Sequence, residues 1–123
     1  MFLLRLFLTT IALASFVAAA TDSTGPSHKE VLRGYLVDMV CMKEEAGKVT
    51  DFAPNHTKKC LQMPTCIQSG YGILLSSKEV LPFDGHGNEL AKKLIAAHRQ
   101  EKGFVIKATG VRQGSRFDAT RIE

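Results

Sequence analysis

The three cysteines of the chain and one of its four histidines fall in a single segment, from Asp38 to Gly70. This segment, DMVCMKEEAGKVTDFAPNHTKKCLQMPTCIQSG, is too polar and too often interrupted to form a core strand. Stretches that are rich in β-forming residues lie before and after it. We therefore expect a β-rich domain that carries the segment as an insertion, and we expect any chemistry of the protein to lie there.

The first 20 residues have the pattern of a secretory signal peptide. Arg5 precedes a run of Leu, Phe, Ile, Ala and Val that ends in three alanines, Ala18 to Ala20. The alternative is an uncleaved membrane anchor, because a bilayer-spanning helix needs about 20 apolar residues. The polar sequence TDSTGPS, which follows at once, favours cleavage after Ala20. We expect an exported protein, periplasmic or secreted, with no membrane span once the signal peptide is removed.

The remaining chain is long enough for one small domain. We predict a flexible tether over residues 21–28 and the domain over residues 29–123. Loss of Arg5 with the signal peptide lowers the formal charge from +4 to +3, and the basic residues are scattered. Specific nucleic-acid binding is therefore not expected. We expect a monomer whose partner is an unidentified protein or small ligand.

Alternating apolar and polar residues predict five strands and one helix outside the insertion. The first strand is long, with Gly34 at a bulge or bend. The helix begins at Asn88 and has apolar residues at helical spacing. The predicted strands are EVLRGYLVDMVC, YGILLSS, EVLPF, GFVIKATGV and SRFDATRIE. The order strand, Cys-rich insertion at about 41–70, strand, strand, helix, strand, strand is the connectivity of the five-stranded OB barrel.

Within the insertion, residues 43–55 are charged or small and are predicted to form a loop. Asn55 is a candidate N-cap for a short helix through HTKKCLQM. Pro64 is expected to stop regular hydrogen bonding soon after this helix.

Three stretches of the chain resemble a group of small exported bacterial OB-fold proteins, of the periplasmic type and mostly without an assigned function. The most specific motifs are Gly-x-x-x-Asp-x-x-Cys, from Gly34 to Cys41, and His-x-x-x-Cys followed by Cys and Gly, from His56 to Gly70. The resemblance covers nearly the whole mature chain and implies a mainly β, five-stranded OB-fold-like barrel. The alternative is another small α+β domain that shares this order of elements. The stretches are GYLVDMVC, HTKKCLQMPTCIQSGYGILL and GFVIKATGVRQGSRFDATRIE.

One interpretation of the insertion is a metal site made of Cys41, His56, Cys60 and Cys66. His56 and Cys60 are four residues apart, so on a helix both side chains would lie on one face. Three thiolates and an imidazole form a complete tetrahedral ligand set for zinc and also suit copper(I). Asp38 is then a candidate to orient the imidazole from the second shell.

The other interpretation is a disulfide, since an oxidising compartment favours pairing of cysteines. Cys41 would then pair with Cys60 or Cys66 and hold the insertion against the sheet. A bridge over a loop of this length stabilises by about 3 kcal/mol in the chain-entropy model. One of the three thiols would remain for metal binding, pairing with a partner or redox chemistry.

No arrangement of a nucleophile, a base and an orienting acid, and no phosphate-binding glycine loop, is present in the sequence. We therefore do not expect an enzyme. The leading hypothesis is an exported OB-fold binding module that engages a ligand, a metal ion or an envelope partner through its barrel face or the Cys/His insertion. The alternatives are a thiol redox or metal-handling protein, and a structural domain with a disulfide-stapled loop.

Overall fold

The structure is a computed structural model that describes residues 27–123. The predicted signal peptide and residues 21–26 of the predicted tether lie outside the described residues. The elements follow one another along the chain as β1 (Lys29–Asp38), α1 (Met39–Glu44), α2 (Val49–Phe52), η1 (Ala53–Asn55), α3 (Lys58–Leu61), α4 (Pro64–Ser69), β2 (Tyr71–Leu74), β3 (Val80–Pro82), α5 (Gly85–Ala97), β4 (Val105–Gln113) and β5 (Arg116–Ile122).

The five strands form one antiparallel sheet in the order β3-β2-β1-β4-β5. The central strand β1 pairs with β4 along its first part and with β2 along its last part, and Tyr35 takes part in both ladders. Phe83, the residue after β3, forms an isolated parallel bridge with Phe117 of the other edge strand, β5. The predicted mainly β fold with helices is confirmed. The predicted barrel is not closed, because β3 and β5 lie at opposite edges of the sheet and no ladder pairs them.

Gly34 lies where β1 changes from one neighbouring strand to the other. A Cβ atom at this position would lie 2.1 Å from the carbonyl oxygen of Leu74, which is far inside the contact distance. The strands can approach each other here only because the residue has no side chain. Glycine is therefore required at position 34 by the packing of β1 against β2, and the ladder between β1 and β4 runs through it without the predicted bulge.

Substitution of Gly34 by alanine is expected to lower the free energy of unfolding by about 2–3 kcal/mol, since the methyl group displaces the β2 backbone. Gly47→Ala is the matched control, because a Cβ atom there has no neighbour within 4 Å. Urea denaturation of both variants measures the difference. Equal stabilities would contradict the close approach of β1 and β2.

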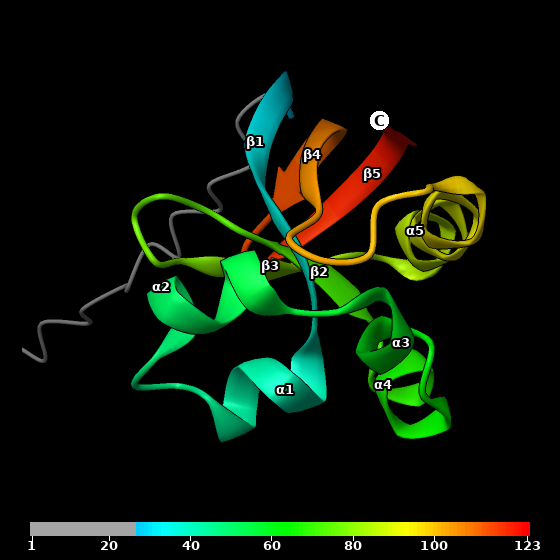
Figure 1. Ribbon diagram of the computed structural model, residues 1–123. Helices are drawn as coiled ribbons and strands as arrows, with labels where there is room; N and C mark the ends of the chain where they lie inside the picture. Colours follow the sequence, from blue (N-terminus) through cyan, green and yellow to red (C-terminus); the bar gives the residue numbers. More distant parts are fainter. Residues whose placement is uncertain (1–26) are drawn as a thin grey trace, which may run out of the picture.

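Two clusters of apolar side chains hold the domain together. The larger cluster is shared by the sheet, α3 and α5, and its buried members include Leu36, Ile73, Ile95 and Phe117. The smaller cluster joins the sheet to the insertion and consists of Val37, Met42, Val49, Ala53 and Leu74. The insertion is therefore packed onto the sheet, and its helices α1 to α4 gather near the C-terminal end of β1 (Figure 1).

Several predicted boundaries are wrong, and side-chain caps account for two of them. The first strand ends at Asp38 rather than Cys41, because the Asp38 side chain caps α1. Helix α5 begins at Gly85 rather than Asn88, because Asp84 caps it with a hydrogen bond from the backbone N–H of Gly87, 3.0 Å. The predicted loop at 43–55 contains α2 and η1.

Candidate metal centre

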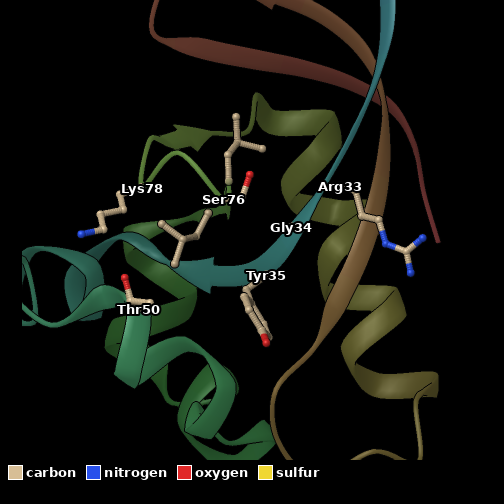
Figure 2. A pocket seen from close by; sticks show the side chains of 8 residues that line it. Arg33, Gly34, Tyr35, Thr50, Ser76 and Lys78 are labelled. Carbon is tan, nitrogen blue, oxygen red and sulfur yellow. The ribbon is translucent and has the colours of Figure 1, made fainter.

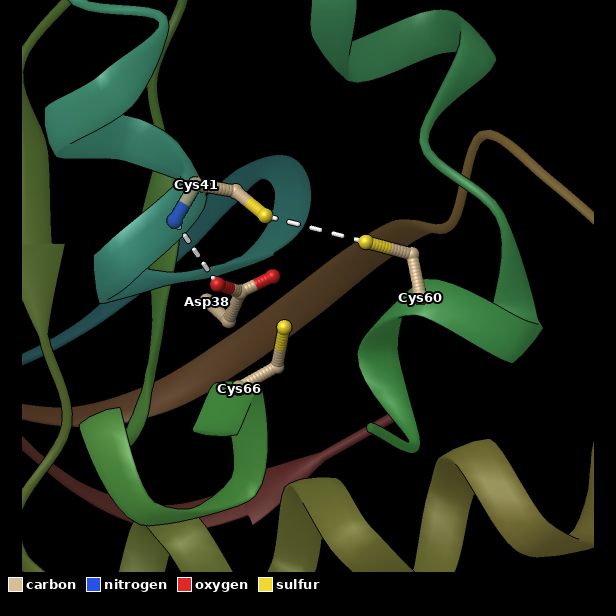
Figure 3. Close-up of side chains that lie close together, drawn as sticks. All are labelled: Asp38, Cys41, Cys60 and Cys66. Carbon is tan, nitrogen blue, oxygen red and sulfur yellow. Dashed lines mark hydrogen bonds between the residues drawn. The ribbon is translucent and has the colours of Figure 1, made fainter. Parts of the chain in front are cut away.

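Four side chains of the insertion converge at the end of β1: Asp38, Cys41, Cys60 and Cys66. One ligand atom from each of them lies within 4.8 Å of the corresponding atom of every other. The Sγ atoms of Cys41 and Cys60 are 3.7 Å apart. Figure 3 shows the three sulfur atoms, which come from different helices, pointing toward a common centre beside the Asp38 carboxylate.

Each cysteine is the third residue of a short helix. Cys41 lies in α1, Cys60 in α3 and Cys66 in α4. Asp38 and Thr57 cap the first two helices, and their side chains accept hydrogen bonds from the backbone N–H groups of Cys41 (2.9 Å) and Cys60 (3.1 Å). The caps fix the first turns, so they also fix where these two sulfur atoms point.

Hydrogen bonds join the helices that carry the cysteines. The Ser69 hydroxyl accepts a hydrogen bond from the Val40 N–H at 3.2 Å and donates one to the Cys66 carbonyl at 2.8 Å, which ties α1 to α4. The buried Tyr71 hydroxyl donates to the Leu61 carbonyl at 2.5 Å and so ties the end of α3 to β2. Helices of four to six residues are unstable alone, so these contacts and the packing must hold them.

Helix α3 ends before Pro64, as predicted, but regular hydrogen bonding does not stop there, because Pro64 begins a new helix. Pro64 is the first residue of α4, a position where the missing N–H of proline costs nothing. The chain reverses between Leu61 and Pro64, and this reversal returns Cys66 to the neighbourhood of Cys60.

His56 lies beside the cluster and contacts Asp38. Its Nε2 atom is 3.0 Å from Asp38 Oδ2, and both side chains are almost completely buried, at 2% and 0% exposure. The distance is that of an ion pair, although the ring is not aligned for a straight hydrogen bond. The predicted pairing of His56 and Cys60 on one helical face is wrong, because His56 has an extended backbone between η1 and α3.

The two carboxylate oxygens of Asp38 therefore have different neighbours. Oδ1 accepts the capping hydrogen bond from Cys41, and Oδ2 faces His56. The predicted contact between Asp38 and the imidazole is present, but Asp38 itself is a member of the converging set and His56 is not. The sequence does contain a signal for the position of Asp38. A residue that can cap a helix stands three positions before a cysteine, both at Asp38 and at Thr57.

Burial and mutual proximity set the ionisation of the cluster. Burial, together with the nearby Asp38 carboxylate and Cys60, raises the pKa of the Cys66 thiol to about 11. Burial and the contact with Cys60 raise the pKa of Cys41 far above its usual range. Burial also acts to raise the pKa of Asp38, but the contacts with His56 and the Cys41 N–H outweigh it, so this pKa is lowered. Without a metal ion, Cys41 and Cys66 are therefore protonated thiols at neutral pH.

A surface hollow lies elsewhere, between β1, α2 and the turn after β2. Its volume is about 400 Å³, and apolar surface dominates its lining. The charged residues at its edge, Arg33 and Lys78, point in opposite directions in Figure 2. No set of charged groups among its lining residues converges on a ligand position, so the cysteine cluster is the better candidate site.

Comparisons of the chain with protein-family models, with curated protein sequences and with solved structures gave no match. Among the described residues, no helix has both the length and the apolar character needed to cross a membrane. The case for a function therefore depends on the chemistry of the cluster.

Proposed function

We propose that this protein is an exported, OB-fold-like module that binds one zinc ion through Cys41, Cys60, Cys66 and Asp38, without catalysing a reaction. The observation that carries the proposal is the convergence of three sulfur atoms and one carboxylate oxygen from three segments of the chain. Cysteine sulfur and carboxylate oxygen are both zinc ligands, and four protein ligands with at least two cysteines are typical of structural zinc sites.

The distance between Cys41 and Cys60 supports a metal ion between the sulfur atoms. In a tetrahedral site with Zn–S bonds of about 2.3 Å, two sulfur ligands are about 3.8 Å apart. The Sγ atoms are 3.7 Å apart, close to this edge length. A disulfide needs a separation of about 2.0 Å, and all three cysteines are free in the structure.

The mixed ligand set favours zinc over copper(I). Copper(I) prefers soft ligands alone, whereas zinc accepts thiolate and carboxylate together. His56 would then act in the second shell, where it holds the Asp38 carboxylate in place. The sequence had suggested His56 as a zinc ligand and Asp38 as the group that orients it; here Asp38 is the ligand and His56 orients it. A site with four protein ligands leaves no open position for substrate, which agrees with a non-catalytic role.

The finer fold and the location belong to the same proposal. The order of the elements and the bridge between Phe83 and Phe117 support a partly open five-stranded OB barrel. The signal-peptide pattern of residues 1–20 supports export to the periplasm or beyond. The zinc-ordered insertion would present a fixed surface to an unidentified protein or small ligand.

The proposal is tested by zinc analysis of the protein from the exported fraction, kept reduced and then dialysed. We expect one zinc ion per chain, and no bound zinc when Cys60 and Cys66 are both replaced by serine. Reduced protein that fails to bind stoichiometric zinc at micromolar concentrations would overturn the proposal. It would then favour the disulfide-stapled structural domain.

Zinc affinity is expected to rise with pH. Cys41 and Cys66 are protonated in the metal-free protein, because their pKa values are raised, and both must lose a proton to bind zinc. Below about pH 9, each of these protons weakens the apparent affinity about tenfold per unit of falling pH, or about 100-fold for the pair. Competition with a chelator of known affinity at pH 6, 7 and 8 measures the slope. An affinity that does not change with pH would contradict thiolate ligation.

A further inference from the structure

The three cysteines of the cluster differ in their access to solvent. Cys41 and Cys66 are buried, with 9% and 3% of their surface exposed, whereas Cys60 is partly exposed. Cys60 lies on α3, which has only four residues, and the residue before it in this helix, Lys59, is exposed. A reagent that arrives from solvent therefore meets the Cys60 sulfur first.

Cys41 is in direct contact with Cys60 and is a partner for it once Cys60 is modified. The two Sγ atoms are in contact at 3.7 Å, and they come from two different helices. A thiol this close to a mixed disulfide is placed to attack it, which is how intramolecular disulfides form. Formation of the bond requires the sulfur atoms to approach to about 2.0 Å. Because α3 has four residues and α1 has six, we expect Cys60 to move more than Cys41 when the bond forms.

We propose that Cys60 is a modification site for small disulfides of the oxidised glutathione class, and that Cys41 resolves the adduct into a Cys41–Cys60 disulfide that expels the zinc ion. This inference rests on the proposed zinc site. In addition, Cys60 reacts with the small disulfide, Cys41 attacks the resulting adduct, and Cys66 remains a free thiol.

The chemistry balances in two exchange steps. In the first, the Cys60 thiolate attacks one sulfur of the small disulfide; a Cys60–S bond forms, the S–S bond of the reagent breaks, and one small thiolate leaves. In the second, Cys41 attacks the Cys60 sulfur as a thiolate, the state that zinc ligation would give it; in the metal-free protein its thiol first gives a proton to solvent. The Cys41–Cys60 bond forms and the second small thiolate leaves. The two cysteines lose two electrons, and the reagent gains them. Zinc changes no oxidation state.

The loss of zinc follows from the ligand count. After the reaction, Cys66 and Asp38 are the only members of the cluster that remain available to the metal. Two ligands do not complete a closed tetrahedral zinc site. Metal binding and the Cys41–Cys60 disulfide are therefore mutually exclusive states of the same cluster.

The test treats the full zinc-loaded protein with oxidised glutathione, follows zinc release with a colorimetric chelator and maps the disulfides by mass spectrometry of peptides. We expect release of one zinc per chain, a peptide cross-link between Cys41 and Cys60, and a free Cys66 that reacts with an alkylating reagent. In Cys41→Ser the reaction is expected to stop with one glutathione on Cys60. In Cys66→Ser the Cys41–Cys60 cross-link should still form.

Other results overturn the inference. A cross-link that involves Cys66, or a glutathione adduct that persists on Cys60 of the unaltered protein, would contradict the assigned roles. Zinc that stays bound after the cross-link forms would contradict the mutual exclusion. The same peptide mapping on metal-free protein keeps the two proposals distinguishable, because it tests the order of reaction even if the protein binds no zinc.

Discussion

Replacement of Cys60 by serine is expected to lower the affinity for zinc by at least about 100-fold. Structural zinc sites gain about 12 kcal/mol on binding, which is about 3 kcal/mol for each of four ligands. A loss of this size corresponds to a factor of about 100 or more in the dissociation constant. Cys60 is partly exposed, so the substitution leaves the core packing in place.

The affinity of Cys60→Ser is measured by competition with a chelator, at neutral pH and with a reductant present. Lys59→Ser is the matched control, because Lys59 is the exposed neighbour on the same helix and does not belong to the converging set. The control is expected to bind zinc as the unaltered protein does. Equal affinities of the two variants would show that the Cys60 thiolate is not a ligand.

Replacement of Asp38 by alanine is expected to lower the free energy of unfolding of the metal-free protein by about 2–4 kcal/mol. The substitution leaves the buried His56 ring without its polar partner. It also removes the side-chain cap of α1, a loss of about 1 kcal/mol within that total. Because the pKa of Asp38 is lowered, its contribution is present above its ordinary pKa of 3.8 and is lost as the pH falls through the folded value.

Two variants accompany Asp38→Ala in urea denaturation at neutral pH, with a chelator present to exclude metal effects. Asp51→Ala, at an exposed position of α2, is expected to change stability by less than about 0.5 kcal/mol. Asp38→Asn keeps an oxygen for the cap, so its stability is expected to lie between those of Asp38→Ala and Asp51→Ala. An Asp38→Ala protein as stable as Asp51→Ala would contradict the buried contact with His56.

Much of the sheet was predictable from the sequence because its strands are long and alternate. Lys29–Asp38 and Val105–Gln113 each bury one face over several residues, and this gives a clear period of two. The helix Gly85–Ala97 is long enough for its apolar face to be recognised, and only its first turn was misplaced. The close packing at Gly34 was not predictable, because the carbonyl oxygen that forbids a side chain there belongs to a distant strand.

The insertion was much less predictable, for a physical reason. Its four α-helices have four to six residues each, which is too short for a helical period to show. They are held by tertiary contacts, such as the hydrogen bonds of Ser69 and the packing of Val49 and Ala53 on the sheet. Contacts of this kind join residues that are far apart in the sequence.

The same reason explains the candidate site. The sequence grouped Asp38, Cys41, His56, Cys60 and Cys66 correctly as neighbours. It placed His56 on the helix with Cys60 because a spacing of four fits a helix, but Thr57 caps that helix and leaves His56 outside. Asp38, at the end of β1, caps the helix that carries Cys41, and this places its carboxylate beside the sulfur atoms.

The central claim is that three cysteine sulfur atoms and one carboxylate oxygen hold a single metal ion. X-ray absorption at the zinc edge of the reduced, zinc-loaded protein tests it directly. We expect three sulfur neighbours at about 2.3 Å and one lighter neighbour at about 2.0 Å, the latter from Asp38. A first shell of nitrogen and oxygen atoms alone, or one with a single sulfur, would contradict it.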